Sequence, residues 1–287
     1  MKQLHITECP RDAMQGIKTF IPTPLKVKYL QQLLRVGFDI LDFGSFVSPK
    51  IIPQMQDTTD VLQQLDLSNT RTQLLAIIAN YKGAEKSVSF NQITYLGFPL
   101  SVSEEFQKRN THATIADALQ QVEAIQNLCI KHHKTLRVYL SMAFGNPYNE
   151  EWSVEKVIQM ADQLYQMGIQ HIALADTIGC STPQTIQHLF NTLTYKLPKI
   201  TWIAHLHSTP HNATEKIQAA IQNNCIHFDT ALLGYGGCPM AKEDLTGNIA
   251  TEILLDYAQQ HAIPTPLNYN ELKKAQEIAQ MIFNTYH

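Results

Sequence analysis

The feature that most constrains this chain is a repeated alternation between short apolar runs and longer stretches with helical spacing. Apolar runs of strand length recur along the sequence at Leu4–Cys9, Ile40–Phe46, Leu74–Asn80, Ile93–Phe98, Leu136–Met142, His171–Asp176, Thr201–His207 and His227–Gly234. Short apolar runs bounded by turn residues are typical of buried strands. Strands that alternate with helices predict a parallel sheet, because a parallel connection needs a crossover segment.

Helical spacing fills the gaps between these runs. The predicted helices include Pro24–Val36, Thr59–Gln64, Ile115–His132, Ser153–Met167, Thr182–Thr194, Ala213–Asn223, Ile249–Gln259 and Asn270–Phe283. Thr114 and Thr182 are expected to cap two helices, and Gly37 and Gly168 to end two others. Eight strand–helix repeats predict an α/β fold, a (β/α)8 barrel with a C-terminal helical extension. The alternative, a doubly wound open sheet, would favour a glycine-rich phosphate turn, and the sequence contains no G-x-G-x-x-G.

Length and composition exclude several functional classes. The 287 residues are 44% hydrophobic and show no linker, so we expect one barrel domain over residues 1–287. With 22 basic against 25 acidic residues, the chain lacks the basic excess of a nucleic-acid-binding protein. No apolar run approaches the roughly 20 residues that cross a bilayer, and the first residues lack a signal-peptide pattern. The 5 cysteines form no C-x-x-C pair, which predicts reduced thiols and a cytoplasmic location.

Polar residues collect where the predicted strands end. In a barrel of this kind, catalytic residues come from the carboxyl ends of the strands. The residues that follow or close the predicted strands are Arg11, Asp12, Asp42, Asp176, His205, His207 and Cys238. Their common placement predicts a shared site.

Two histidines separated by one residue indicate a metal site. Side chains two positions apart in a strand share a face, so His205 and His207 should converge. Asp12 adds a carboxylate and Asn248 an amide oxygen, and such a set of nitrogen and oxygen ligands suits Mg²⁺ or Mn²⁺. The alternatives are a hydrogen-bonded histidine pair without a metal, a capping role for Asp12, and for Asn248 the cap of the helix Ile249–Gln259.

Other polar residues admit both a functional and a structural interpretation. Arg11 can balance charge on an enolate or carboxylate, or form a structural ion pair. Cys238 follows Gly236-Gly237, where a mobile loop can carry a proton-transferring thiol, although a small buried side chain is the commoner role. Basic residues in the upper loops suit the phosphates of coenzyme A, or are solvated surface charges: Lys18, Lys50, Lys82, Lys108 and Arg109.

Several segments together resemble one known family. They are Glu8–Gln15, Ser45–Lys50, Ile52–Met55, Ser103-Glu104, Lys108–Asn110, Phe144–Tyr148, Asp176–Gly179, Gly236–Pro239 and Gly247–Glu252. The chain thereby resembles the 3-hydroxy-3-methylglutaryl-CoA lyases, which belong to the DRE-TIM metallolyase barrels. The resemblance implies retro-Claisen cleavage of 3-hydroxy-3-methylglutaryl-CoA to acetyl-CoA and acetoacetate, with an acyl-CoA substrate and a divalent cation.

The resemblance also implies roles for individual residues. The metal ligands would be Asp12, His205, His207 and Asn248. The catalytic residues would be Arg11 at the enolate oxygen, Cys238 and Asp42 in proton transfer, and Asp176 at the substrate. Substrate binding would involve Gln15, Thr177, Lys18, Ser45 and Asn80, with Gln15 also supporting Arg11.

The chain departs from the family pattern in ways that spare the implied ligands. Asp42 replaces a usual glutamate and moves the carboxylate by about one carbon–carbon bond length. Ser208 replaces the aspartate that usually follows the second metal histidine, which removes a charge beside a ligand. Ala13 and Ala175 replace glycines. These departures leave the acyl-CoA substrate less defined than the reaction class.

Three other functions stay open at this level. The first is a Claisen-type isopropylmalate or citramalate synthase, which usually has a further regulatory domain and lacks the Gly-Gly-Cys-Pro segment. The second is an aldolase with the same metal ligands. The third is a non-catalytic acyl-CoA-binding protein. Barrels of this kind often form homodimers, but no long apolar stripe marks an interface, and the sequence does not say whether the pathway is leucine degradation.

Overall fold

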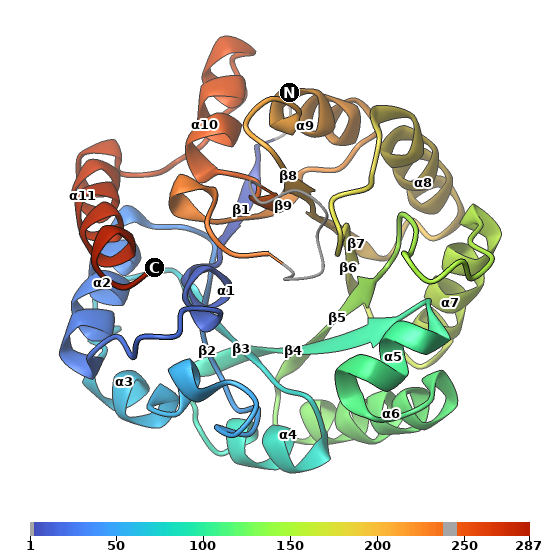
Figure 1. The fold of residues 1–287 in the computed structure, drawn as a ribbon, viewed down its shortest axis with the longest axis horizontal. Helices are drawn as coiled ribbons and strands as arrows, with labels where there is room; N and C mark the ends of the chain where they lie inside the picture. Colours follow the sequence, from blue (N-terminus) through green and yellow to red (C-terminus); the bar gives the residue numbers. More distant parts are fainter. Residues whose placement is uncertain (1–2, 238–245) are drawn as a thin grey trace.

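The computed structural model describes residues 3–237 and 246–287 and centres on a closed barrel of parallel strands (Figure 1). The strands follow one another around the barrel in chain order, with β9 closing against β1. Their bounds are β1 His5–Glu8, β2 Ile40–Ser45, β3 Gln73–Ile77, β4 Ile93–Ser101, β5 Thr135–Ser141, β6 His171–Ala175, β7 Thr201–His205 and β9 His227–Thr230. The predicted (β/α)8 barrel is thus confirmed.

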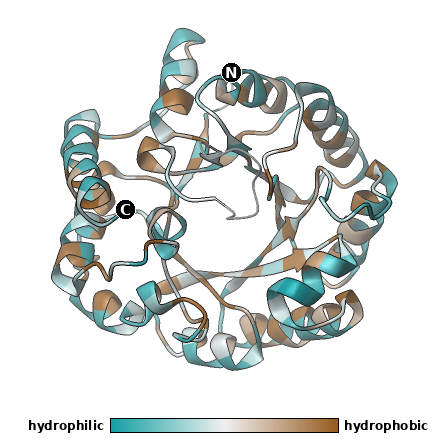
Figure 2. Cartoon of the chain, viewed as in Figure 1, coloured by the Kyte–Doolittle hydropathy of each residue, from teal (hydrophilic) through white to brown (hydrophobic). Residues whose placement is uncertain are grey.

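A ring of helices surrounds the strands (Figure 1). The helices are α1 Pro10–Gln15, α2 Thr23–Val36, α3 Thr58–Gln64, α4 Tyr81–Val88, α5 Glu104–Thr111, α6 Ile115–Lys131, α7 Val154–Gln166, α8 Pro183–Lys196, α9 Ala213–Gln222, α10 Thr251–Gln260 and α11 Tyr269–Tyr286, with short 3₁₀ turns η1 Pro53–Met55 and η2 Leu232–Gly234. Figure 2 shows hydrophilic residues along their outer surfaces. The side chains of Thr114 and Thr182 cap α6 and α8 as expected. Gly37 ends α2 in a left-handed conformation, at φ 85°.

Three predicted strands are too long at their carboxyl ends. The third barrel strand stops at Ile77, because Asn80 has left the sheet to cap α4 through Gly83 N. The strand predicted as His227–Gly234 ends at Thr230, and η2 follows it. The run Thr201–His207 is broken after His205, and His207 begins the short strand β8 (His207–Ser208).

The break after β7 creates a second, two-stranded sheet. β8 pairs antiparallel with β10 (Gly247–Asn248), and His207 lies opposite Asn248. On its other side Gly247 lies against the end of η2, where a Cβ would be 2.2 Å from the Gly234 carbonyl oxygen, so only glycine fits there. The small sheet brings a residue from near the end of the chain to the upper mouth of the barrel.

The C-terminal helix extends the barrel, as expected. α11 lies beside α2 (Figure 1), where Gln32 Nε2 donates to the Glu271 carboxylate at 2.7 Å. The amide of Asn268 donates to the Val36 carbonyl oxygen at 2.9 Å, so α11 begins where α2 ends. Within the described residues, no helix has the length and apolar character that crossing a membrane requires.

Candidate metal centre and active site

Asp12 lies at the centre of a buried polar cluster. Pro10 opens α1 directly after β1, and this first turn places Arg11 and Asp12 at the upper end of the barrel. Asp12 Oδ1 accepts hydrogen bonds from Arg11 Nη1 and Gln15 Nε2, both at 2.9 Å. Asp12 Oδ2 accepts from Asn248 Nδ2 at 2.6 Å. One carboxylate therefore joins the start of the barrel to the two-stranded sheet.

The Arg11 guanidinium is held by three side chains. Its Nε donates to Asp42 Oδ2 at 3.0 Å, and Nη2 lies 2.5 Å from the same oxygen. Its Nη1 donates to Asp12 and to Gln15 Oε1, the latter at 2.8 Å. A guanidinium carries five N–H bonds, so one Nη2 proton has no partner among the described residues. Arg11 is both rigid and able to donate to a ligand.

The two histidines converge, although they belong to different strands. The ring centroids of His205 and His207 lie 5.3 Å apart. His207 Nδ1 lies 3.2 Å from the Thr177 carbonyl oxygen, which can only accept, so Nδ1 carries the proton in this contact. Its Nε2 is buried without a hydrogen-bond partner, and the same holds for Asn248 Oδ1. These unpaired atoms fit a bound cation, because buried polar atoms are rarely left unsatisfied.

The donor set has the composition of a divalent metal site. Ligand atoms of Asp12, His205 and His207 lie within 4.8 Å of one another. The alternative that Asn248 caps a helix is wrong, because α10 begins at Thr251 with Ala250 before it. The Asn248 amide instead donates to Asp12 and to the Tyr235 carbonyl oxygen. Two imidazoles, a carboxylate and an amide oxygen suit a divalent cation that prefers nitrogen and oxygen ligands.

Burial and charge set the ionisation of the cluster. Burial raises the pKa of Asp12, but Arg11, His205 and the Asn248 hydrogen bond outweigh it and lower that pKa to about 2. Burial lowers the pKa of His207 to about 4, with His205 adding to the effect. Burial raises the pKa of Asp42 to about 6 in spite of Arg11. At neutral pH the site presents carboxylates and a neutral His207, as metal binding requires.

Asp176 and Thr177 lie behind His207. Asp176 Oδ2 accepts from Lys216 Nζ at 2.8 Å and from Ser181 Oγ at 2.5 Å. Lys216 also donates to the His207 carbonyl oxygen at 2.7 Å. Both charged groups are buried, so this ion pair fixes the backbone of His207 and of the turn after β6.

The remaining predicted residues are placed farther out. Ser45 is buried at the end of β2, where its hydroxyl accepts from the Val47 amide at 3.2 Å. Asn80 is exposed and caps α4, and Lys18 is exposed after α1. None of these three has a hydrogen bond to the Asp12 cluster within the described part of the chain. Cys238 lies outside the described residues.

The basic residues expected in the upper loops fall into two groups, and three of them lie in helices instead, Lys82 in α4 and Lys108 and Arg109 in α5. Lys108 and Arg109 form ion pairs with Glu104 and Glu105 one helical turn earlier in α5. The other group follows three neighbouring strands, is exposed, and has no ion pair among the residues that the structure describes: Lys18, Lys50 and Lys82. The second group is therefore the better candidate for binding an anionic ligand.

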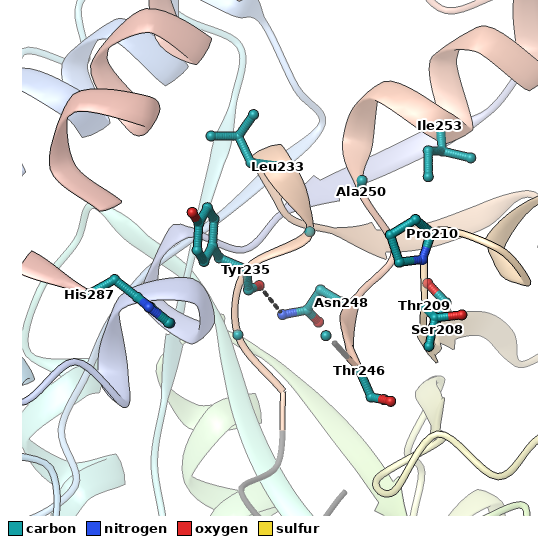
Figure 3. Close-up of a pocket in the computed structure, with 13 residues that line it drawn as sticks. Ser208, Thr209, Pro210, Leu233, Tyr235, Thr246, Asn248, Ala250, Ile253 and His287 are labelled. Atoms are coloured by element: carbon teal, nitrogen blue, oxygen red, sulfur yellow. Dashed lines mark hydrogen bonds between the residues drawn. The ribbon is translucent and has the colours of Figure 1, made fainter. Parts of the chain in front are cut away.

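A cavity of about 340 Å³ lies beside the cluster (Figure 3). It shares Asn248 with the ligand set, and its wall includes Ser208, Tyr235 and the C-terminal His287. Figure 3 shows the Asn248 amide bonded to the Tyr235 carbonyl, at 2.9 Å. Asn248 thus contacts both this cavity and Asp12, the first of the other candidate ligands.

The sequence analysis missed three buried charged residues around the site. Arg137, Lys216 and Asp229 are nearly or fully buried. Arg137 Nη1 donates to Asp229 Oδ1 at 3.0 Å, and Asp229 Oδ2 lies 3.3 Å from His205 Nδ1. The available signal was a charged residue inside an otherwise apolar run, as at Asp229 within His227–Gly234 and Arg137 within Leu136–Met142.

Comparison with known proteins agrees with this geometry. The HMGL-like family matches residues 4–279. The mitochondrial hydroxymethylglutaryl-CoA lyase of Mus musculus is 32% identical over 96% of this chain and 84% of its own length. The lyase YngG of Bacillus subtilis is 31% identical over 96% and 91%. A crystal structure of the HMG-CoA lyase of Bacillus subtilis superposes with a TM-score of 0.93 at 29% identity, covering 99% of this chain and 95% of that one. This chain therefore belongs to the HMGL-like family.

Proposed function

We propose that the protein is a divalent-metal-dependent 3-hydroxy-3-methylglutaryl-CoA lyase that forms acetyl-CoA and acetoacetate. It is a carbon–carbon lyase by its family, and residues 1–287 act as one catalytic domain. The observation that carries the proposal is the buried cluster in which Arg11, Asp12 and Asp42 meet His207 and Asn248, whose facing polar atoms lack partners. The proposed substrate is the one for which its relatives, the hydroxymethylglutaryl-CoA lyases, are named.

Four residues would hold the cation, which we propose to be Mg²⁺ or Mn²⁺: Asp12, His205, His207 and Asn248. When bound, the cation would supply Lewis-acid polarisation of substrate oxygen atoms. Asp12 is ionised at neutral pH and His207 is neutral there, so neither must lose a proton before binding. Lys216 and Asp176 act as positioning residues, because they fix the backbone of His207.

Arg11 would stabilise the negative charge of the enolate, and Asp42 would accept the proton of the substrate hydroxyl. As the carbon–carbon bond breaks, the tertiary hydroxyl becomes a ketone and loses its proton, and the electron pair moves onto the acetyl-CoA fragment as an enolate. The free Nη2 proton of Arg11 donates to the enolate oxygen, and a fixed guanidinium needs no reorganisation to do so. The Asp42 carboxylate accepts the hydroxyl proton, for which a pKa of about 6 is suited. Cys238 would return a proton to the enolate carbon.

The acyl-CoA would enter beside the strands β1, β2 and β3. Lys18, Lys50 and Lys82 follow these strands and are exposed, so they would bind the phosphates of coenzyme A. Gln15 and Thr177 flank the cluster, and Ser45 and Asn80 lie along the same rim. The cysteines of the described chain are free thiols, which agrees with a cytoplasmic enzyme.

The test is release of acetyl-CoA and acetoacetate from 3-hydroxy-3-methylglutaryl-CoA, measured with Mg²⁺ or Mn²⁺ and with a chelator. We expect metal-dependent release of both products in equal amounts. Cys238→Ser should lower turnover and leave metal and ligand binding unchanged. A protein that binds the metal and releases neither product would refute the lyase activity and favour a condensing enzyme or an aldolase.

A further inference from the structure

One carboxylate lies directly behind a proposed metal ligand. Asp229 is fully buried in β9, and its Oδ2 lies 3.3 Å from His205 Nδ1. The register of the barrel explains the contact: β7 and β9 are neighbours, and Ala204 pairs with Phe228. His205 and Asp229 follow these two residues, so their side chains meet inside the barrel.

The other carboxylate oxygen of Asp229, Oδ1, is also held by a charged side chain. Arg137 Nη1 donates to Asp229 Oδ1 at 3.0 Å and to Thr7 Oγ1 at 3.1 Å. Arg137 belongs to β5 and Thr7 to β1, so two other barrel strands hold the carboxylate of β9 through Arg137. The ring of Tyr139 also meets the His205 ring edge-on, with centroids 5.4 Å apart. Rotation of the His205 ring is thus restricted from two directions.

The chemistry of this contact determines which nitrogen of His205 is free. An ionised carboxylate can only accept hydrogen bonds, so Nδ1 carries a proton in this contact, and in the neutral ring Nε2 then keeps its lone pair. We propose that Asp229 is a positioning residue that holds the His205 ring with Nε2 available to the cation, and that Arg137 holds Asp229 in turn. The inference rests on the metal centre of the proposed function. Carboxylates behind metal-binding histidines commonly act in this way.

The contrast with His207 makes Asp229 the more important support. His207 Nδ1 donates to a neutral carbonyl oxygen, that of Thr177. Ser208, beside His207, is a hydroxyl residue and supplies no charge. Within the described residues, Asp229 is the carboxylate that contacts a proposed ligand imidazole at its Nδ1.

The first test is the affinity of the metal-free full-length protein for Mn²⁺, read from the signal of unbound Mn²⁺ in electron paramagnetic resonance. We expect Asp229→Asn to weaken binding about 10- to 100-fold relative to the wild type. Asp39→Asn is the matched control, because Asp39 pairs with His5 at 3.1 Å at the opposite end of the barrel. The control should bind Mn²⁺ as the wild type does. A folded Asp229→Asn protein with wild-type affinity would overturn the inference.

Asp229→Asn also leaves the buried Arg137 without its ion-pair partner, which can unfold the protein for an unrelated reason. The double variant Arg137→Met/Asp229→Asn removes both charges. If Asp229 positions His205, the double variant binds Mn²⁺ as weakly as the single one. Recovery of wild-type affinity would mean that Asp229 merely neutralises Arg137, and would overturn the inference.

A measurement on the wild type needs no variant. The ¹⁵N shifts of His205 in the metal-free protein at about pH 8 should show a proton on Nδ1, and a proton on Nε2 instead would contradict the proposal. These results are separable from the proposed function. A wild type that binds Mn²⁺ but releases no acetyl-CoA would refute the lyase and leave the role of Asp229 standing.

Discussion

Asn248→Ala tests whether the unpaired amide oxygen contributes to metal binding. In the metal-free protein the substitution removes the bond from Asn248 Nδ2 to Asp12, a hydrogen bond to a charged group. Such bonds contribute about 1.5–3 kcal/mol. With an unfolding entropy of about 2.1 cal/mol/K per residue, 287 residues give roughly 0.6 kcal/mol/K, so Tm falls by about 3–5 °C.

The metal-dependent part of the stability is the sharper readout. A ligand at 1,000 times its Kd stabilises the folded state by about 4.1 kcal/mol, and each tenfold loss of affinity removes about 1.4 kcal/mol. On the same entropy, each tenfold loss reduces the shift in Tm caused by Mn²⁺ by about 2 °C. Loss of Asn248 Oδ1, a buried atom without a partner, should therefore reduce that shift by at least 2 °C.

Thermal unfolding with saturating Mn²⁺ and with a chelator measures both effects. Asn268→Ala is the matched control, because Asn268 caps α11 and is remote from the cluster. It should cost about 1 kcal/mol, or about 2 °C, and keep the full Mn²⁺-dependent shift. If Asn248→Ala also keeps the full shift, Asn248 is not a ligand and the assignment of its oxygen is wrong.

Two further perturbations test the charge arrangement. Arg11→Lys should lower kcat about 10²- to 10³-fold and leave the Mn²⁺ affinity nearly unchanged. A lysine ammonium cannot bind Asp42 and also donate to an enolate in the geometry of a guanidinium. An unchanged kcat would show that Arg11 takes no part in the mechanism. Burial lowers the pKa values of His171 and His227 to about 4 in the folded protein. As the pH drops from about 7 toward 4, these histidines become protonated in the unfolded chain but not in the folded protein, so the free energy of unfolding falls. At pH 5 the loss is about 2 kcal/mol for each, so His171→Gln/His227→Gln should lose about 2–4 kcal/mol less than the wild type between pH 8 and pH 5 in urea unfolding with a chelator. Parallel pH profiles of the two proteins would contradict this.

The sequence was sufficient for the barrel because its signal is repetitive. Each strand is an apolar run and each helix has an amphipathic period, so errors of a few residues at strand ends leave the topology unchanged. Those errors matter locally, however. His205 and His207 were expected on one strand, and instead the chain leaves the barrel between them.

The convergence of the site residues was predictable, while their contacts were not. The rule that catalytic groups follow barrel strands brought Arg11, Asp12 and the two histidines together. Asn248 needed the pairing of β8 with β10, which depends on backbone contacts between two-residue strands. Asp229 needed the register between β7 and β9, because nothing in its own neighbourhood marks it as the partner of His205.

The break between β7 and β8 decides how the proposed metal centre would assemble during folding. Asp12 and His205 belong to the barrel end, whereas His207 and Asn248 belong to the two-stranded sheet. The contact between Asp12 and Asn248 joins residues 236 positions apart in the chain. A cation bound by both parts acts as a cross-link across nearly the whole polypeptide. If these four residues hold the cation as proposed, high-affinity binding arises only after the barrel has closed and the segment with Asn248 has docked. A nascent chain that ends before Asn248 then carries three of the four proposed ligands.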